Sequence, residues 1–435
     1  MLTENKEVPE GWKTLKLSDV CNLNPSKPKV EDKKTLATFL GMTDLSEEGR
    51  VTGGEPKAVS LLEKGFTSFQ DEDVLVAKIT PCFENGKGAL VTDLKNGFGY
   101  GSTEFHVLRA KSNVTPEFIY YHTRTHKFIS EGTANMVGSA GHRRVQSEFV
   151  GNYTIIVPPL PEQNKIVKIL SIVDKKLEKI ELKILATQQL EKGLMQKLFS
   201  EGAGIPIKDG NGHVIWQPHA EFEKSGLGSL PKGWKLRAFD SLTHKITDGA
   251  HHTPKYIGSG VPFLRVTDLK NKDIDLSRTK FISQVEHEIL IKRCKPERGD
   301  ILYSKNGTIG IPKLVDWDFE FSVFVSLCLI KPNDDIDAKF LELMLKSPLI
   351  HEQIRKQAKQ GAVTNLHLED IRKFQIPTPP LPEQNRIAVI LTAVLDKLKH
   401  IENEKNKVVE MKKGLMQKLL TGQLRVKVDE EYQVS

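Results

Sequence analysis

The sequence predicts an α+β protein in which two globular heads, related by pseudo-twofold symmetry, are separated by a pair of long antiparallel helices that form a coiled coil. Three observations lead to this prediction. A long sequence unit occurs twice in the 435-residue chain. Each copy ends in a long segment with one narrow apolar stripe. The rest of each copy mixes short alternating runs, typical of strands, with turn signals and helical segments.

The repeat is defined by matching words at a constant offset. LPEQN begins at 160 and again at 381, and GLMQKL begins at 193 and again at 414, so both offsets are 221 residues. Upstream, PEGW at 9 matches PKGW at 231, and FLGMTDL at 39 echoes FLRVTDL at 263. A period of half the chain is far too long for a solenoid repeat. It indicates a duplicated two-part module whose junctions are alike and whose bodies differ.

Long helices are predicted over residues 160–200 and 381–421. Pro161 and Pro382 stand at the first helical position, and Glu162 and Glu383 fall in the first turn, near the positive end of the helix dipole. Apolar residues then recur at alternating spacings of four and three, which is typical of a coiled-coil seam. The predicted seam residues are Ile166, Leu170, Val173, Leu177 and Ile180 in the first copy, and Ile387, Leu391, Val394, Leu398 and Ile401 in the second.

A helix of roughly 40 residues, roughly 60 Å long, with one narrow apolar stripe needs a partner. Because the two stripes match, the simplest partner of each helix is its own copy, and a twofold relation makes the pair antiparallel. The alternative is two separate helices, each packed on its own domain. Lys405 replaces the isoleucine that the first copy carries at Ile184, so we expect the seam to loosen there.

The predicted domains follow from the repeat. Head 1 covers residues 1–159, the first helix 160–200, head 2 residues 230–380 and the second helix 381–421. Residues 201–229 have the glycine-rich, polar composition of a linker. The tail, 422–435, is short and polar, and we expect it to be frayed. Strands are predicted at DVLVAKI, ALVTDL and TEFHVLRA in head 1 and at VPFLRVTDL, DILYSKN and SVFVSLCLI in head 2, and helices at TPEFIYYHTRTHKFI and DAKFLELMLKSPLIHEQIRKQA.

Composition narrows the class of protein. The net charge of +7 permits an acidic partner such as nucleic acid. No apolar run is long enough to predict a membrane span, and the N-terminal residues show no signal region. The cysteines are Cys21, Cys82, Cys294 and Cys328, and without a CxxC pair they predict neither a zinc site nor a disulfide framework. Buried thiols in a reducing cytoplasm are the expected arrangement.

Basic and polar loops in both heads are candidate contacts to DNA, because their side chains can donate to phosphates and base edges. The alternative for each is a solvated loop residue. His251 and His252 could instead bind a metal, but no cysteine or carboxylate cluster accompanies them in the sequence. The candidates are Lys78, Lys87, His142, Arg143 and Arg144 in head 1, and Lys245, His251, His252, Lys255, Lys305, Asn306, Thr364, Asn365 and His367 in head 2.

Motifs of catalysis and cofactor binding are missing from the sequence. There is no GxxxxGK[ST] loop, no GxGxxG after a strand, no Asn-Pro-Pro-aromatic motif of adenine methyltransferases, and no PD dipeptide to begin a nuclease site. Nothing in the chain therefore calls for catalytic residues, a metal or a bound cofactor.

The combined pattern resembles the DNA-specificity subunit of Type I restriction-modification systems. The resemblance rests on the PxGW start, the GDILYSKNGTIG stretch, the GAVTNLHLEDIRKFQIPTPPLPEQ junction and the helix ending in GLMQKL, and it covers about residues 9–420. It implies that each head is a target recognition domain, that each long helix is a conserved spacer, and that the chain itself is not catalytic. It also implies double-stranded DNA, two methyltransferase subunits and restriction/translocase subunits as partners. The implied cofactors, S-adenosylmethionine, ATP and Mg, belong to those partners.

Two departures and two alternatives accompany this resemblance. Lys405 interrupts the second seam, and GSAGHRRVQSEFV in head 1 diverges from the corresponding stretch of head 2. A stand-alone DNA methyltransferase or nuclease with a divergent site remains the enzymatic alternative. A helical scaffold whose heads bind protein is the other. The sequence does not give the bases read or the spacer length.

Overall fold

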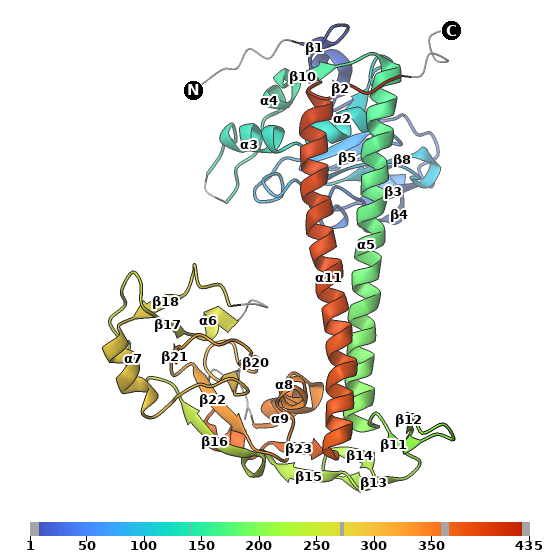
Figure 1. The fold of residues 1–435 in the computed structure, drawn as a ribbon. Helices are drawn as coiled ribbons and strands as arrows, with labels where there is room; N and C mark the ends of the chain where they lie inside the picture. Colours follow the sequence, from blue (N-terminus) through green and yellow to red (C-terminus); the bar gives the residue numbers. More distant parts are fainter. Residues whose placement is uncertain (1–7, 140, 270–273, 358–364, 429–435) are drawn as a thin grey trace. The chain divides into compact units, whose positions relative to one another are not determined.

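The computed structural model describes residues 8–139, 141–269, 274–357 and 365–428. The chain forms two compact units. Unit 1 contains residues 1–181 and 403–435, and unit 2 contains residues 182–402. Each unit therefore holds one head together with one end of each long helix (Figure 1).

Head 1, in unit 1, is built on two four-stranded sheets. The central sheet is antiparallel throughout, with the order β2-β9-β6-β7: Cys21–Leu23, Phe105–Ala110, Val74–Ala77, Gly88–Leu90. The other sheet has the order β4-β3-β8-β5, in which β3 and β8 are parallel: Glu55–Ala58, Leu36–Leu40, Phe98–Gly101, Thr67–Gln70. The remaining elements are β1 (Lys13–Lys16), which pairs with β10 (Thr154–Val157), and the helices α1 (Leu17–Val20), α2 (Pro116–Thr123), α3 (His126–Ala134) and α4 (Ser147–Asn152).

Head 2, in unit 2, repeats this topology. Its central sheet has the order β16-β22-β19-β20: Thr243–Asp248, Leu327–Pro332, Ile301–Ser304, Pro312–Leu314. A three-stranded sheet of order β18-β17-β21, with β17 and β21 parallel, replaces the second sheet: Lys280–Ile282, Val261–Leu264, Ser322–Val323. The remaining elements are β15 (Lys235–Ala238), which pairs with β23 (Gln375–Thr378), and α6 (Val266–Leu269), α7 (Gln284–Ile291), α8 (Ala338–Leu345), α9 (Pro348–Gln357) and α10 (Leu368–Arg372). The α+β class and the duplication are thus confirmed.

Each helix that the sequence predicts near the end of a head is in fact two helices. In head 1 the Thr125 hydroxyl accepts from the Phe128 amide and caps α3, so the chain turns between α2 and α3. In head 2, Pro348 begins α9. Proline would break the interior of a helix, but it is favoured in the first turn, where the N–H that it lacks has no partner within the helix. Two predicted strands are likewise shorter than expected. VPFLRVTDL divides into β17 and α6, and SVFVSLCLI divides into β21 and β22.

The two long helices are α5 (Leu160–Ser200) and α11 (Leu381–Leu420), and they pair in opposite directions within each unit. In unit 1 the start of α5 shares a core with the end of α11. In unit 2 the start of α11 shares a core with the end of α5. These core residues are Ile166, Leu170, Met416 and Leu419 in unit 1, and Ile387, Leu391, Met195 and Leu198 in unit 2.

The seam is largely buried. Eight of the ten predicted seam residues are at most 9% exposed, whereas Leu177 and Val394 are only partly buried. Lys405 does not leave a gap, because its ammonium lies 3.0 Å from the carboxylate of Glu181, which also pairs with Arg50. The expected loosening is therefore replaced by a charge pair.

The repeated Glu-Gln of the junction explains why the LPEQ word occurs twice. Gln163 is fully buried, accepts from the Thr115 amide at 3.0 Å, and donates to the Pro158 carbonyl at 2.9 Å. Gln384 makes the same contacts in head 2, accepting from the Asp337 amide at 2.8 Å and donating to the carbonyl of Pro379 at 2.9 Å. The residues Thr115 and Asp337 are the N-caps of α2 and α8, so each glutamine ties a long helix to the same helix of its head.

Two segments are more ordered than their composition suggested. The predicted linker, 201–229, contains a hairpin formed by β11 (Ile205–Lys208) with β12 (Val214–Gln217). A second hairpin, formed by β13 (Phe222–Ser225) with β14 (Gly228–Pro231), begins in it and ends at the first residues of head 2. The prediction of a frayed tail is wrong for residues 422–428. There the guanidinium of Arg425 donates to both oxygens of Glu162, at 2.8 and 3.0 Å, because the planar fork of arginine matches a carboxylate.

Candidate nucleic-acid interface

The same local arrangement occurs at one end of the central sheet in both heads. In head 1, Lys78 follows β6, and its carbonyl accepts from the Val145 amide at 2.9 Å. In head 2, Lys305 follows β19, and its carbonyl accepts from the Leu366 amide at 2.8 Å. Next to each contact lies an antiparallel β-bridge, which joins Ile79 to Arg144 in head 1 and Asn306 to Asn365 in head 2. We name these arrangements fork 1 (Lys78, Ile79, Arg144, Val145) and fork 2 (Lys305, Asn306, Asn365, Leu366).

The elements that follow each fork fix its position relative to the long-helix junction of its own head. After fork 1 the chain enters α4 and then β10, whose last residue, Val157, is followed by Pro158-Pro159 and the start of α5. After fork 2 it enters α10 and then β23, which leads in the same way to α11. In both heads, therefore, the fork precedes the repeated junction and the long helix by a short stretch of chain.

In fork 1 an arginine is held by a carboxylate. The guanidinium of Arg144 donates to Glu104 through Nη2 at 2.8 Å and through Nε at 3.0 Å. Its Nη1 donates to the carbonyl of His142 at 3.2 Å. The hydrogen bonds from Arg144 lower the pKa of Glu104, so this carboxylate stays ionised. Beside it, Lys78 donates to the Thr103 carbonyl at 3.0 Å, and burial lowers the pKa of its ammonium.

A buried histidine supports the backbone of fork 1. Nε2 of His106 lies 3.0 Å from the carbonyl oxygen of Val145, the residue after Arg144. Burial lowers the pKa of His106 to about 4, so the ring is neutral near pH 7 and donates Nε2–H to that carbonyl. The corresponding position of head 2 is Cys328, since β22 pairs with β19 as β9 pairs with β6.

In fork 2 the lysine is buried against an aspartate. Nζ of Lys305 lies 3.2 Å from Oδ1 of Asp248, and the two side chains are only 7% and 12% exposed. Oδ2 of Asp248 lies 3.4 Å from Nε2 of His251. That nitrogen also accepts from Arg293 at 3.0 Å. The pairing of a buried lysine with a buried carboxylate lowers the cost of removing either charge from water.

The structure brings some predicted site residues together and leaves others apart. Lys78 and Arg144 meet in fork 1, and Lys305, Asn306 and Asn365 meet in fork 2. The remaining described candidates are not part of either fork. Among them His142, Lys255 and His367 are exposed. Thr364 lies outside the described residues.

Several remaining candidates already hold protein acceptors. Arg143 pairs with Glu84 at 2.7 Å, and Lys87 donates to the Met42 carbonyl at 3.2 Å. Lys245 donates to the Arg293 carbonyl at 2.7 Å, and His252 lies 2.9 Å from Glu286. Contact of these residues with DNA stays a prediction.

The two carboxylates of the forks, Glu104 and Asp248, were missed as site residues. Glu104 lies within the predicted strand TEFHVLRA and Asp248 lies shortly before His251, but nothing in a single sequence tells which acidic residue will lie opposite which basic residue. In the structure Glu104 corresponds to Ser326 of head 2, since the carbonyl of each accepts from the amide of the fork lysine, so the second head has no carboxylate at this position.

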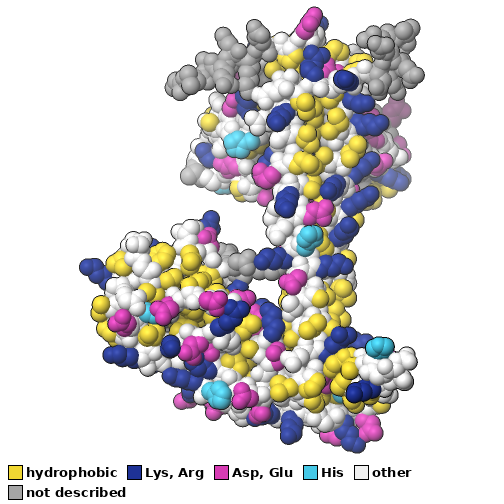
Figure 2. All heavy atoms as spheres, in the orientation of Figure 1, with side chains coloured by type: hydrophobic (Ala, Val, Ile, Leu, Met, Phe, Trp, Pro, Cys, Tyr) yellow, Lys and Arg dark blue, Asp and Glu magenta, His cyan; other side chains and the backbone are white. Residues whose placement is uncertain are grey.

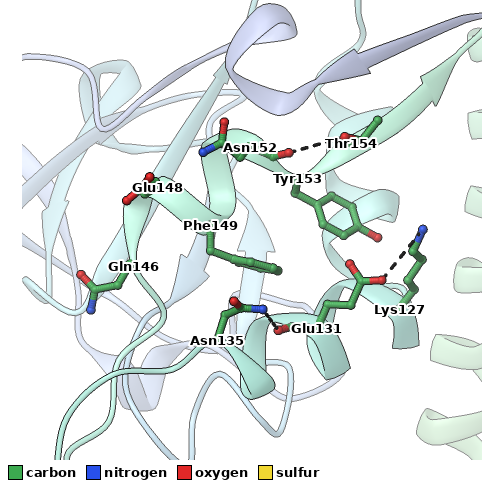
Figure 3. A pocket seen from close by; sticks show the side chains of 9 residues that line it. All are labelled: Lys127, Glu131, Asn135, Gln146, Glu148, Phe149, Asn152, Tyr153 and Thr154. Carbon is green, nitrogen blue, oxygen red and sulfur yellow. Dashed lines mark hydrogen bonds and ion pairs between the residues drawn. The ribbon is translucent and has the colours of Figure 1, made fainter.

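The charge on the visible surface is mixed. Figure 2 shows Lys and Arg side chains interspersed with Asp and Glu in both parts of the chain. A hollow on head 1, lined by α3, α4 and the start of β10, carries Glu131 and Glu148 against one cation, Lys127 (Figure 3). This balance does not favour a phosphate there. Over the described residues no group of three His, Cys, Asp or Glu side chains could hold a metal ion, and no helix is both long and apolar enough to cross a membrane.

Two heads of one topology, each joined to a long helix by the same Pro-Glu-Gln junction, define a duplicated two-headed protein. The chain belongs to the family of the Type I restriction modification DNA specificity domain, whose model matches residues 9–188 and 231–411.

Curated relatives carry the same description. The chain is 36% identical over 200 residues to the Type I restriction enzyme EcoEI specificity subunit of Escherichia coli, a match that covers 44% of this chain and 33% of the relative. The match to the EcoAI specificity subunit is 35% identical with the same coverage, so the chain spans about a third of the length of these two relatives. A putative Type I restriction enzyme specificity subunit of Methanocaldococcus jannaschii, MjaX, is 25% identical over 98% of this chain and 96% of its own.

Solved structures share the fold. A chain of a type I R-M system, studied for complex assembly and conformational transition, superposes with a TM-score of 0.57 at 20% identity, over 96% of this chain and 100% of the other. The S subunit of a Type-I restriction-modification system from M. genitalium gives 0.55 at 15% identity, over 96% and 98% of the two chains.

Proposed function

We propose that this chain is the DNA-specificity subunit of a Type I restriction-modification complex, in which each head reads one half of a bipartite, asymmetric DNA site. The observation that carries the proposal is the recurrence of the fork at the same topological place in both heads, with Arg144 in one and Asn365 in the other. A duplicated frame that presents two different side chains suits a site with two different halves. Membership of the specificity family supports the same conclusion.

The long helices are proposed to set the number of unread base pairs between the half-sites and to dock two methyltransferase subunits. Their outer faces are rich in lysine and glutamate, which leaves polar surface for such partners. Restriction/translocase subunits would complete the complex in the cytoplasm. In this proposal S-adenosylmethionine, ATP and Mg are bound by the partners, and the present chain contributes recognition without catalysis.

The enzymatic alternative, a stand-alone methyltransferase or nuclease, is not favoured, because the curated relatives are named specificity subunits. It makes a distinct prediction. A stand-alone methyltransferase would bind S-adenosylmethionine by itself, whereas the proposed specificity subunit would bind it only in the presence of its modification partners.

The direct experiment selects bound sequences from a library of randomised duplexes, with the full-length chain assembled with its modification subunits. The proposal expects enrichment of two fixed segments separated by a spacer of constant length, and binding that weakens steeply with salt. Salt-dependent binding without any enriched sequence would contradict it. Calorimetry of the chain alone with S-adenosylmethionine is the companion measurement, and binding there would favour the enzyme.

A further inference from the structure

We infer that the position shared by the two forks reads a base in each half-site, and that Arg144 takes guanine in the half read by head 1 whereas Asn365 takes adenine in the half read by head 2. The inference rests on the proposed function and deepens it, because it names the residue and the base edge.

The equivalence of Arg144 and Asn365 is structural. Arg144 forms an antiparallel bridge with Ile79, the second residue after β6, and Asn365 forms one with Asn306, the second residue after β19. The next residue along each segment donates its amide to the carbonyl of the fork lysine. The two side chains therefore leave the same point of the same fold. Sequence divergence hid this match, because the surrounding stretches of the two heads are dissimilar.

Arg144 is oriented as a reader of guanine. One edge of the guanidinium, formed by Nε and Nη2, donates to Glu104. The side chain is nevertheless 44% exposed. The second edge, formed by Nη1 and Nη2, carries only the contact of Nη1 with the His142 carbonyl among the described residues. A guanidinium edge of this kind donates in parallel to O6 and N7 of guanine in the major groove. Glu104 holds the plane in place, so little side-chain freedom is lost when the base arrives.

Asn365 has the complementary chemistry for adenine. An amide carries both an acceptor and donors, so it accepts from N6 and donates to N7 of adenine in parallel. Asn365 is exposed, and its side chain has no hydrogen bond within the described residues. Across the bridge, Oδ1 of Asn306 is buried and has no hydrogen-bond partner within the same residues. A buried acceptor without a partner costs free energy.

The fork lysines cannot distinguish the two halves, because Lys78 and Lys305 are the same residue in both heads. A residue that differs at the equivalent position can account for a difference between the half-sites. A shared lysine suits a phosphate, and phosphate contacts set register without carrying sequence information. Glu104 acts through Arg144, so it is a positioning residue.

The test maps the methylated sites made by the full complex, by sequencing, for wild type and for Arg144→Asn and Asn365→Arg separately. With Arg144→Asn we expect one guanine in the half-site of head 1 to become adenine, or its preference over adenine to fall by roughly 5- to 150-fold, with the other half unchanged. Asn365→Arg should make the opposite change in the half-site of head 2 only. Lys127→Asn, which removes one exposed charge from the same head, should leave both half-sites unchanged.

Two further variants keep the test decisive. Arg144→Lys keeps the charge and loses the two-pronged donor, so binding should persist while the guanine preference falls. Glu104→Gln should weaken that preference without replacing the base. A wild-type complex that shows no two-part site would refute the proposed function itself. A normal two-part site with both half-sites unaltered in Arg144→Lys and Asn365→Arg would overturn only this inference.

Discussion

The indole Nε1–H of Trp12 donates a hydrogen bond to Oε2 of Glu162 at 2.9 Å, and so joins residues 150 positions apart in the sequence. Trp234 donates to Glu383 at the same distance in the other unit. Two of the recurring words, PxGW and LPEQ, therefore supply the donor and the acceptor of one contact. Both carboxylates are almost fully buried, at 4% and 2% exposed, and a buried carboxylate must be supplied with donors.

Further donors to the two carboxylates show how each junction is closed. In unit 1 the additional donor to Glu162 is Arg425, which lies in the segment after α11. In unit 2 the carboxylate of Glu383 accepts from the amides of Ala203 and Gly204, in the segment after α5. The chain that leaves one long helix thus closes over the start of the other.

Trp12→Phe removes a donor from a buried carboxylate, so it should lower the free energy of unfolding by about 1–3 kcal/mol. Chemical denaturation monitored by circular dichroism measures this. The control is Trp216→Phe on β12, where the indole is partly exposed and its N–H donates no hydrogen bond within the part of the chain that the structure describes. It should change stability by less than about 0.5 kcal/mol. Equal losses in the two variants would show that the indole–carboxylate bond is not what stabilises the junction.

The helix seam tolerates charge unevenly. Ile180 is 2% exposed, so Ile180→Lys places an ammonium in a buried position and should destabilise the protein by more than about 3 kcal/mol. Leu177→Lys should cost about 1 kcal/mol, because Leu177 is partly exposed and a lysine stem can lie along the seam while its ammonium reaches water. Thermal unfolding of the two variants in parallel measures the difference, and a larger loss for Leu177→Lys would contradict the burial pattern.

Acid should weaken head 1 through His106. Burial depresses the pKa of His106 to about 4, below its ordinary value of 6.5. Between these values the unfolded chain takes up a proton that the folded chain does not, so the free energy of unfolding falls as the pH falls through this window. The contribution of His106 to this loss is on the order of 3 kcal/mol.

Denaturation at pH 7 and pH 4.5 measures that slope. His106→Gln should reduce it, because glutamine has no proton to take up. The control is His126→Gln, at an exposed position of α3, which should leave the slope as it is in the wild type. A slope that is the same in His106→Gln and in the wild type would show that another group accounts for the acid sensitivity.

The sequence predicted the parts of the fold that local periodicity determines. The α5 and α11 boundaries, the antiparallel pairing and most of the seam followed from apolar spacing and from the repeat. The breaks at Thr125 and Pro348 were not predicted. Both residues are compatible with the start of a new helix, but the apolar spacing around them is also that of one continuous helix, and a single sequence does not decide between the two. The bond from Arg425 to Glu162 joins residues 263 positions apart, and no local pattern encodes such a contact.

The candidate site was predicted only in part, for a related reason. Basic residues such as Lys78 and Arg144 can be picked out from the sequence, because the identity of the residue alone shows that its side chain can donate to DNA. Their partners Glu104 and Asp248 depend on which strands are neighbours. The equivalence of Arg144 with Asn365 is a property of backbone pairing, so it becomes visible only when the two heads are compared as structures.

The proposed role of the helices as a ruler predicts the effect of matched insertions. Seven residues with the seam pattern, inserted after Lys179 and after His400, should keep the seam aligned, because seven residues are about two turns. The added length of about 10 Å corresponds to about three base pairs. Mapping of methylated sites should then show a spacer longer by about three base pairs between unchanged half-sites, and a change in either half-site would argue against the ruler.

The central claim is that each head reads its own half of the target. The most direct measurement is the mapping of methylated sites for a complex in which residues 231–378 are replaced by a second copy of residues 9–157. We expect a symmetric site whose two halves are inverted copies of the half read by head 1. An unchanged asymmetric site, or a new sequence in both halves, would contradict it.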